Sequence, residues 1–205
     1  FSKKSFKSKD FESIITNYNA SPESIYHRLT NILPKDFNLK SLFFLRFSYK
    51  KGAENFKLTK ELHLSKQQSP HANESNEHYC RRWVSLKVLK QITNADKPHV
   101  FDIQKSDYPK EGKRYLVLSS ATQDPFVSDS YRSVSIGIQI NNQLKRKIAF
   151  AGSKSIKTTQ VGVTCERCAI KDCNVRQAQP VFITSVLKDE EIANVVSQLQ
   201  KKYSK

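Results

Sequence analysis

The sequence predicts an α+β fold, with a mostly antiparallel sheet, flanking helices and a small cysteine-rich segment. Three observations support this prediction. Helical and strand-like periods follow the order helix, strands, helix, strands, cysteine segment, helix along 205 residues. The apolar content of 38% is ordinary for a globular chain. Three of the four cysteines, Cys165, Cys168 and Cys173, lie within one short stretch near the C-terminal end.

The first part of the chain predicts two helices followed by two strands. Apolar residues at 11–18 follow helical spacing. A Ser-Pro start predicts a second helix over 21–33, which we expect to stop at Pro34. Aromatic and aliphatic residues at 42–47 predict a central strand, and alternation at 56–64 predicts a half-exposed strand.

The remainder predicts more strands between two helices. The spacing of Trp83, Leu86 and Leu89 predicts a helix behind Cys80. A terminal helix is expected at 189–203, because acidic residues at its start and lysines at its end suit the helix dipole. Further strands are expected at 100–103, 115–119, 134–140 and 148–150.

These elements suggest three parts. Residues 1–20 form a linker and a short helix, residues 21–155 a sheet domain that contributes Cys80, and residues 156–205 the cysteine segment with the last helix. The chain begins with Phe1 and contains no methionine, so we expect a further N-terminal part to precede it.

The charge balance favours polyanionic partners. Thirty-five Lys and Arg against nineteen Asp and Glu give a formal net charge of +16. Such an excess suits nucleic acid or a phosphate-rich ligand. The alternative for any single pair of basic residues is a generally basic, solvated surface. The longest apolar stretch, residues 42–45, is far too short for a membrane span. Since no secretory segment is present either, we expect a cytoplasmic protein.

The cysteines suggest a metal centre. Cys165, Cys168 and Cys173 with the distant Cys80 make a closed set of four thiolates, which suits structural zinc or an iron–sulfur cluster. The spacing alone does not choose between them. Disulfides, free thiols and a redox pair of Cys165 and Cys168 remain open. His71 and His78 are the alternative ligands if one cysteine is not used.

Nothing in the sequence nominates a catalytic centre. The chain has no zinc-protease motif, P-loop, dinucleotide turn or serine elbow, and only five glycines. We therefore expect a protein that is not an enzyme. His27 lies beside an apolar helical stripe, where it either lines a ligand pocket or is a hydrogen-bonded structural histidine.

Four stretches carry a family resemblance. Cys165–Pro180 resembles the C-terminal signature of the short-chain acyl-CoA-responsive bacterial transcription regulators, with Gln177–Pro180 departing from it. Residues 21–29, which end in His-Arg-Leu, and strand residues 43–47 are similar to segments of the same family. Cys80–Trp83 stands in the place of its Cys-Pro-Leu-Trp motif, with two arginines instead of Pro-Leu.

The resemblance implies a GAF-like sensor domain that binds acyl-CoA, joined to a small subdomain. In that subdomain Cys80, Cys165, Cys168 and Cys173 would ligate a 4Fe–4S cluster, with zinc as the alternative. A helix-turn-helix in the missing N-terminal part would contact DNA, and a homodimer is possible. The candidate pocket residues are His27, Arg28 and Arg46. The competing hypothesis is a zinc-stapled basic module that binds nucleic acid directly.

Overall fold

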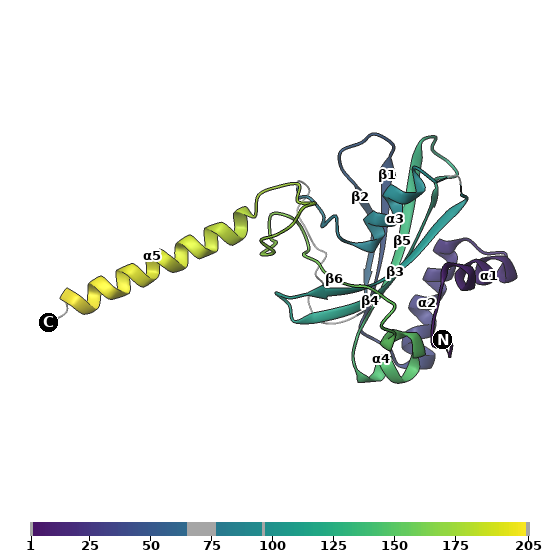
Figure 1. Ribbon diagram of the computed structural model, residues 1–205, viewed down its shortest axis with the longest axis horizontal. Coiled ribbons are helices and arrows are strands. Elements are labelled where there is room, and N and C mark those ends of the chain that lie inside the picture. Colours follow the sequence, from purple (N-terminus) through teal and green to yellow (C-terminus); the bar gives the residue numbers. More distant parts are fainter. Residues whose placement is uncertain (1, 65–76, 96, 204–205) are drawn as a thin grey trace. The chain divides into compact units, whose positions relative to one another are not determined.

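The computed structural model describes residues 2–64, 77–95 and 97–203. The chain divides into two compact units. Unit 1 comprises Phe1–Ala72 and Arg81–Val161, and unit 2 comprises Asn73–Cys80 and Gly162–Lys205. The predicted α+β class is confirmed, because unit 1 contains a six-stranded, mostly antiparallel sheet with helices (Figure 1).

The sheet has the strand order β2-β1-β5-β4-β3-β6. Neighbouring strands are antiparallel except for β6, which runs parallel to β3. The strands expected at 115–119 and 134–140 are confirmed within β4 and β5, which pair in a long register from Tyr115 opposite Gln139 to Gln123 opposite Tyr131. The strands are β1 (Leu42–Lys50), β2 (Lys57–His63), β3 (His99–Tyr108), β4 (Lys113–Gln123), β5 (Ser130–Gln139) and β6 (Thr158–Gln160).

Helices cover both faces of this sheet. The helices of unit 1 are α1 (Ser8–Tyr18), α2 (Pro22–Phe37), α3 (Val84–Ile92) and α4 (Asn142–Lys147), followed by the 3-10 turn η1 (Ala149–Gly152). In Figure 1, α1, α2 and α4 lie on one side of the sheet and α3 on the other. The expected start of α2 is confirmed, since the Ser21 hydroxyl accepts a hydrogen bond from the Ser24 N–H and Pro22 is the first helical residue.

The larger core lies beneath α1 and α2. Alternate residues of the central strands point to this face, including Phe44, Leu118 and Ile136, all at most 4% exposed. The helices contribute Phe11 and Tyr26, whose rings lie 5.4 Å apart. The Tyr26 hydroxyl bonds to Ser120, and burial raises the pKa of this tyrosine far above its usual range. The ring is thus a fixed, neutral part of the core.

The opposite face carries small side chains where β4 and β5 meet α3. Ser119 and Ser135 are buried, and their hydroxyl oxygens lie 2.7 Å apart. Gly137 is required by close packing, since a Cβ there would lie 2.1 Å from the ring of Phe43. The same pairs of strands therefore bury large aliphatic side chains on one face and compact ones on the other.

Two predictions for unit 1 are wrong: the end of one helix and the type of one short element. Helix α2 continues through Pro34 to Phe37, because a proline near the helix end removes only one backbone hydrogen bond and Asn38 closes the last turn in the left-handed conformation. The expected strand at 148–150 is part of α4's end and η1. Its apolar residues are buried in the core, and a run this short does not distinguish strand from helix.

In unit 2 the terminal helix α5 (Val181–Tyr203) begins eight residues earlier than predicted. Its first turns contain Val181, Ile183 and Thr184, and β-branched residues are weak helix formers. The acidic residues at 189–191 therefore lie inside the helix, and the prediction that they start it is wrong. Of the helices in the described residues, none is both long and apolar enough to cross a membrane.

Candidate metal centre and ligand groove

All four cysteines belong to unit 2. Cys80, Cys165 and Cys168 are buried, Cys173 is half-buried, and all four are free thiols. Backbone hydrogen bonds join their segments, because the Cys80 N–H donates to Val163 O at 3.1 Å and the Cys165 N–H donates to His78 O at 2.8 Å. A strand-like bridge between Tyr79 and Thr164 therefore sets the residues before Cys80 and Cys165 side by side.

A single arginine holds the loop that carries the other cysteines. The Arg176 guanidinium donates hydrogen bonds to the carbonyls of Cys165 at 3.1 Å, of Cys168 at 3.4 Å and of Ile170. The Gln177 N–H donates to the Cys165 sulfur at 3.4 Å. Backbone N–H donors of this kind stabilise thiolate ligands of a metal.

Gly162 makes room for the third buried cysteine. A Cβ at this position would lie 2.8 Å from the Cys168 sulfur and 3.0 Å from its Cβ. Any side chain at 162 would therefore displace the thiol. The sequence does not point to Gly162, because the spacing of the cysteines does not indicate which residue packs against them.

The chemistry of the donor set suits a thiolate-bound metal, but in the described part of the chain the thiols are not grouped around one point. Four free thiols and an N–H donor to sulfur occur within one unit. Among residues 2–64, 77–95 and 97–203, however, no three Cys, His, Asp or Glu side chains are grouped so as to hold a metal ion. The ligand set remains a prediction.

Two carboxylates, Glu77 and Glu166, hold the segments that carry the cysteines. Glu77 accepts hydrogen bonds from Arg167 Nε at 2.8 Å and from the Thr164 hydroxyl at 2.6 Å. The Arg167 guanidinium also lies 4.4 Å from the Phe182 ring centre. The hydrogen bond from Arg167 is the main cause that holds the pKa of Glu77 below its usual value, so this carboxylate is ionised.

Glu166 holds His78 through two contacts. Its oxygens accept the His78 backbone N–H at 3.0 Å and lie 2.7 Å from the ring Nδ1. His78, one of the alternative metal ligands, thus already has a carboxylate partner on one ring nitrogen. The other, His71, lies outside the described residues. Sequence reasoning missed Glu77 and Glu166, which carry no metal or catalytic motif of their own.

Of the three candidate pocket residues, two lie against the same carboxylate and the third does not. His27 and Arg46 meet at Glu23, which lies 3.6 Å from His27 Nε2 and accepts a 2.9 Å hydrogen bond from Arg46. The His27 ring also stacks on Phe44 with centroids 4.4 Å apart. Arg28 is exposed on α2. The Lys60 Nζ atom lies 3.0 Å from His27 Nε2. None of the three candidate residues lines either of the two cavities described next.

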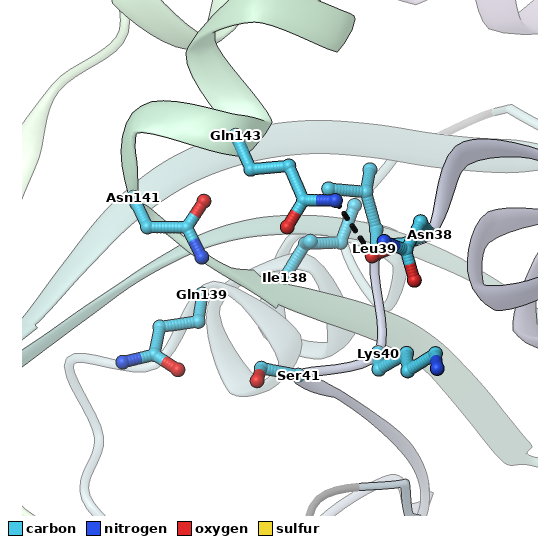
Figure 2. A pocket seen from close by; sticks show the side chains of 8 residues that line it. All are labelled: Asn38, Leu39, Lys40, Ser41, Ile138, Gln139, Asn141 and Gln143. Carbon is cyan, nitrogen blue, oxygen red and sulfur yellow. Dashed lines mark hydrogen bonds between the residues drawn. The ribbon is translucent and has the colours of Figure 1, made fainter.

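A groove of about 330 Å³ opens at the junction of α2, β1, β5 and α4. We call it the amide groove, because side-chain amides dominate its lining. Leu39 and Ile138 form its apolar floor, and Figure 2 shows the Gln143 amide reaching the carbonyl of Asn38, with a distance of 2.9 Å. Its polar side chains belong to Asn38, Lys40, Ser41, Gln139, Asn141 and Gln143.

A second cavity, beneath α3, is much smaller. It offers about 10 Å³ between Phe43, Trp83 and Tyr108, room for no more than one water molecule. Of these two cavities only the amide groove has the size of a ligand site. Sequence patterns do not reveal this groove, because its lining comes from two stretches, 38–41 and 138–143, that are far apart along the chain.

Comparison with known proteins identifies the family. Residues 63–197 match the model of the short-chain fatty acyl coenzyme A regulator, C-terminal family. The chain belongs to this family. Neither the curated proteins nor the solved structures yielded a match. The resemblance on the cysteine segment is thereby confirmed, and the match makes this chain a regulator domain whose family is named for short-chain fatty acyl-CoA.

The ion pair of Glu77 and Arg167 predicts an acid-sensitive stability of unit 2 in this regulator domain. Because the folded-state pKa of Glu77 lies below the unfolded value, the pair stabilises fully above the unfolded pKa of about 4.3. The stabilisation is lost as pH falls through the folded pKa. We expect amides at 162–180 to lose protection from hydrogen exchange over that range.

The Glu77→Gln variant supplies the control, because it removes the titrating group and keeps the shape. Its exchange at 162–180 should be faster than that of the parent at neutral pH and less dependent on pH below 5. An unchanged pH profile in this variant would show that another group controls the acid sensitivity of unit 2.

Proposed function

We propose that the chain is the ligand-sensing part of a bacterial transcription regulator that binds short-chain acyl-CoA and carries a 4Fe–4S cluster. The observation that carries this proposal is the family match, which spans residues of both units. In this proposal unit 1 is a GAF-like sensor, and a helix-turn-helix outside this sequence contacts DNA in the cytoplasm. The domain senses and does not catalyse.

The composition of the chain supports an acyl-CoA ligand. Coenzyme A carries several phosphate charges, and a formal net charge of +16 favours such a polyanion. Unit 1 also provides a groove of ligand size that is lined by hydrogen-bonding groups. Both features would serve the recognition of a phosphorylated, largely polar molecule.

The cysteine unit supports the cluster. Cys80, Cys165, Cys168 and Cys173 would hold it, with the Gln177 N–H donating to the Cys165 sulfur. A cluster bound by four thiolates leaves iron no open position, which suits a structural or sensing role. Since the thiols are not grouped for a metal among the described residues, cluster binding would draw the cysteine side chains together and further stabilise the loop that Arg176 holds.

The cluster is tested by replacing single cysteines. After anaerobic purification we expect a brown protein with about four iron atoms per chain. Changing Cys80, Cys165, Cys168 or Cys173 to Ser, one at a time, should remove the chromophore, while Ser155→Ala, at an exposed site in unit 1, should keep it. Zinc at one atom per chain without iron would contradict the cluster and favour the zinc-stapled module.

The acyl-CoA ligand is tested by calorimetry with acetyl-, propionyl- and butyryl-CoA. We expect at least one to bind, and its affinity to fall as salt rises from 50 to about 500 mM, because salt screens phosphate–cation contacts. The free fatty acids, which lack the phosphates, serve as controls. Absence of both heat and thermal stabilisation with every thioester would contradict the proposal.

We further propose a homodimer formed by α5 with a second copy of itself. Its C-terminal half exposes an apolar stripe, Ile192, Val195, Val196 and Leu199, each between 46% and 62% exposed. An antiparallel pair would set Ile192 opposite Leu199 of the second copy and Val195 opposite Val196. The same register sets the acidic positions 189–190 opposite positions 201–202, which are lysines in the sequence.

Sedimentation of the whole chain tests this pairing. Val195→Asp should abolish the dimer, while Ser197→Asp, on the opposite side of the helix, should not. Replacing both Asp189 and Glu190 with Lys should weaken the dimer through like-charge repulsion, and adding Lys201→Glu with Lys202→Glu should restore it. A dimer that ignores these charge changes would refute the antiparallel register.

A further inference from the structure

The amide groove is too small for a whole acyl-CoA and too polar for its acyl chain. Its volume of about 330 Å³ lies at the lower end of the range for ligand sites. The apolar part of its wall consists of Leu39 and Ile138, both nearly fully buried behind the polar groups. A ligand of this size must therefore leave its apolar end elsewhere and place a polar end here.

The lining selects the kind of polar group. Asn38, Gln139 and Asn141 present side-chain amides, and Lys40 adds an ammonium group. None of the lining residues is acidic. Side-chain amides donate and accept hydrogen bonds together, which is the pattern that recognises the edge of an adenine base.

Cations adjoin the groove through α4. This helix begins beside Asn141 and continues with Lys145, Arg146 and Lys147. From 141 to 161 the sequence holds five Lys and Arg and no Asp or Glu, a stretch we call the basic segment. All five of its cations are exposed, and none has an ion-pair partner in the part of the chain that the structure describes.

A sixth cation from the sheet joins them. Lys105 on β3 donates a 2.6 Å hydrogen bond to the carbonyl of Ser153, within the basic segment. Burial and the nearby Lys145 ammonium lower the pKa of Lys105, so the two positive charges repel each other. An anion placed between them would relieve this repulsion, and phosphate is such an anion.

We propose that the amide groove and the basic segment bind the phosphorylated adenosine end of acyl-CoA. The amides of the groove would contact the base, and Lys145 with Lys105 would contact phosphate. This inference rests on the proposed acyl-CoA ligand and adds the place where its nucleotide end binds. It leaves the acyl chain to another part of unit 1.

The test compares ligands that share or lack the nucleotide. Calorimetry on the whole chain would use propionyl-CoA, adenosine 3′,5′-bisphosphate and propionyl-pantetheine. Lys145→Glu and Gln139→Glu, which place negative charge at the site, should each weaken the two nucleotide ligands by about tenfold or more. Lys110→Glu, the same charge change at an exposed turn, should leave them within about twofold.

The ligands also separate this site from the broader function. If propionyl-CoA binds and neither Lys145→Glu nor Gln139→Glu weakens it, the location is wrong and the acyl-CoA function stands. If only the bisphosphate binds and both variants weaken it, the site is correct and the acyl-CoA function fails. Equal loss in Lys110→Glu would show that overall charge is responsible, which overturns the site.

Nucleic acid shares the same chemistry and is the remaining occupant to exclude. A duplex DNA of unrelated sequence, added at physiological salt, should not displace the bisphosphate at concentrations near its own weak affinity. Full displacement by DNA at equal phosphate concentration, with equal loss of DNA binding in Lys145→Glu, would assign the basic segment to DNA and overturn the proposal.

Discussion

The pairing of β4 with β5 organises unit 1, because these two strands lie at the centre of the sheet and are buried on both of its faces. Their register places Leu118 opposite Ile136 and Ser119 opposite Ser135. A shift of one residue would turn the aliphatic side chains toward α3 and the serines toward α2. The helices pack on opposite faces only because this register holds, and the amide groove forms where β5 leaves the sheet.

Much of this architecture follows from the sequence. The alternation of strands, the two opening helices and the capping of α2 by Ser21 are local signals, and each predicted the structure correctly. The failures occur where tertiary packing outweighs local preference. Ile148 and Phe150 are buried, and an apolar residue can be buried from a helix as well as from a strand. Their apolar character therefore does not predict a strand. The β-branched start of α5 likewise conceals a helix from propensity alone.

The candidate sites show the same division. The spacing of the cysteines predicted a metal centre, because ligands that lie close together in the sequence form a recognisable motif. No sequence motif marks Glu77, Gly162 or the amides of the groove, since their roles depend on residues that only folding brings together. His27 and Arg46 belong to one candidate set, and in the folded chain both lie against Glu23, a residue without any motif. A pocket is thus harder to foresee than a ligand cluster.

The chain order of unit 2 has a consequence for biosynthesis. Its first piece ends at Cys80 and its second begins at Gly162, with the second part of unit 1 between them in sequence. During translation Cys80 therefore emerges well before Cys165 and waits while β3, β4, β5 and β6 are made. At about 5–20 residues per second that delay lasts several seconds. The Cys80 thiol must stay reduced and without a bound partner through that interval. The cysteine unit can therefore be completed only after all strands of the sheet have been synthesised.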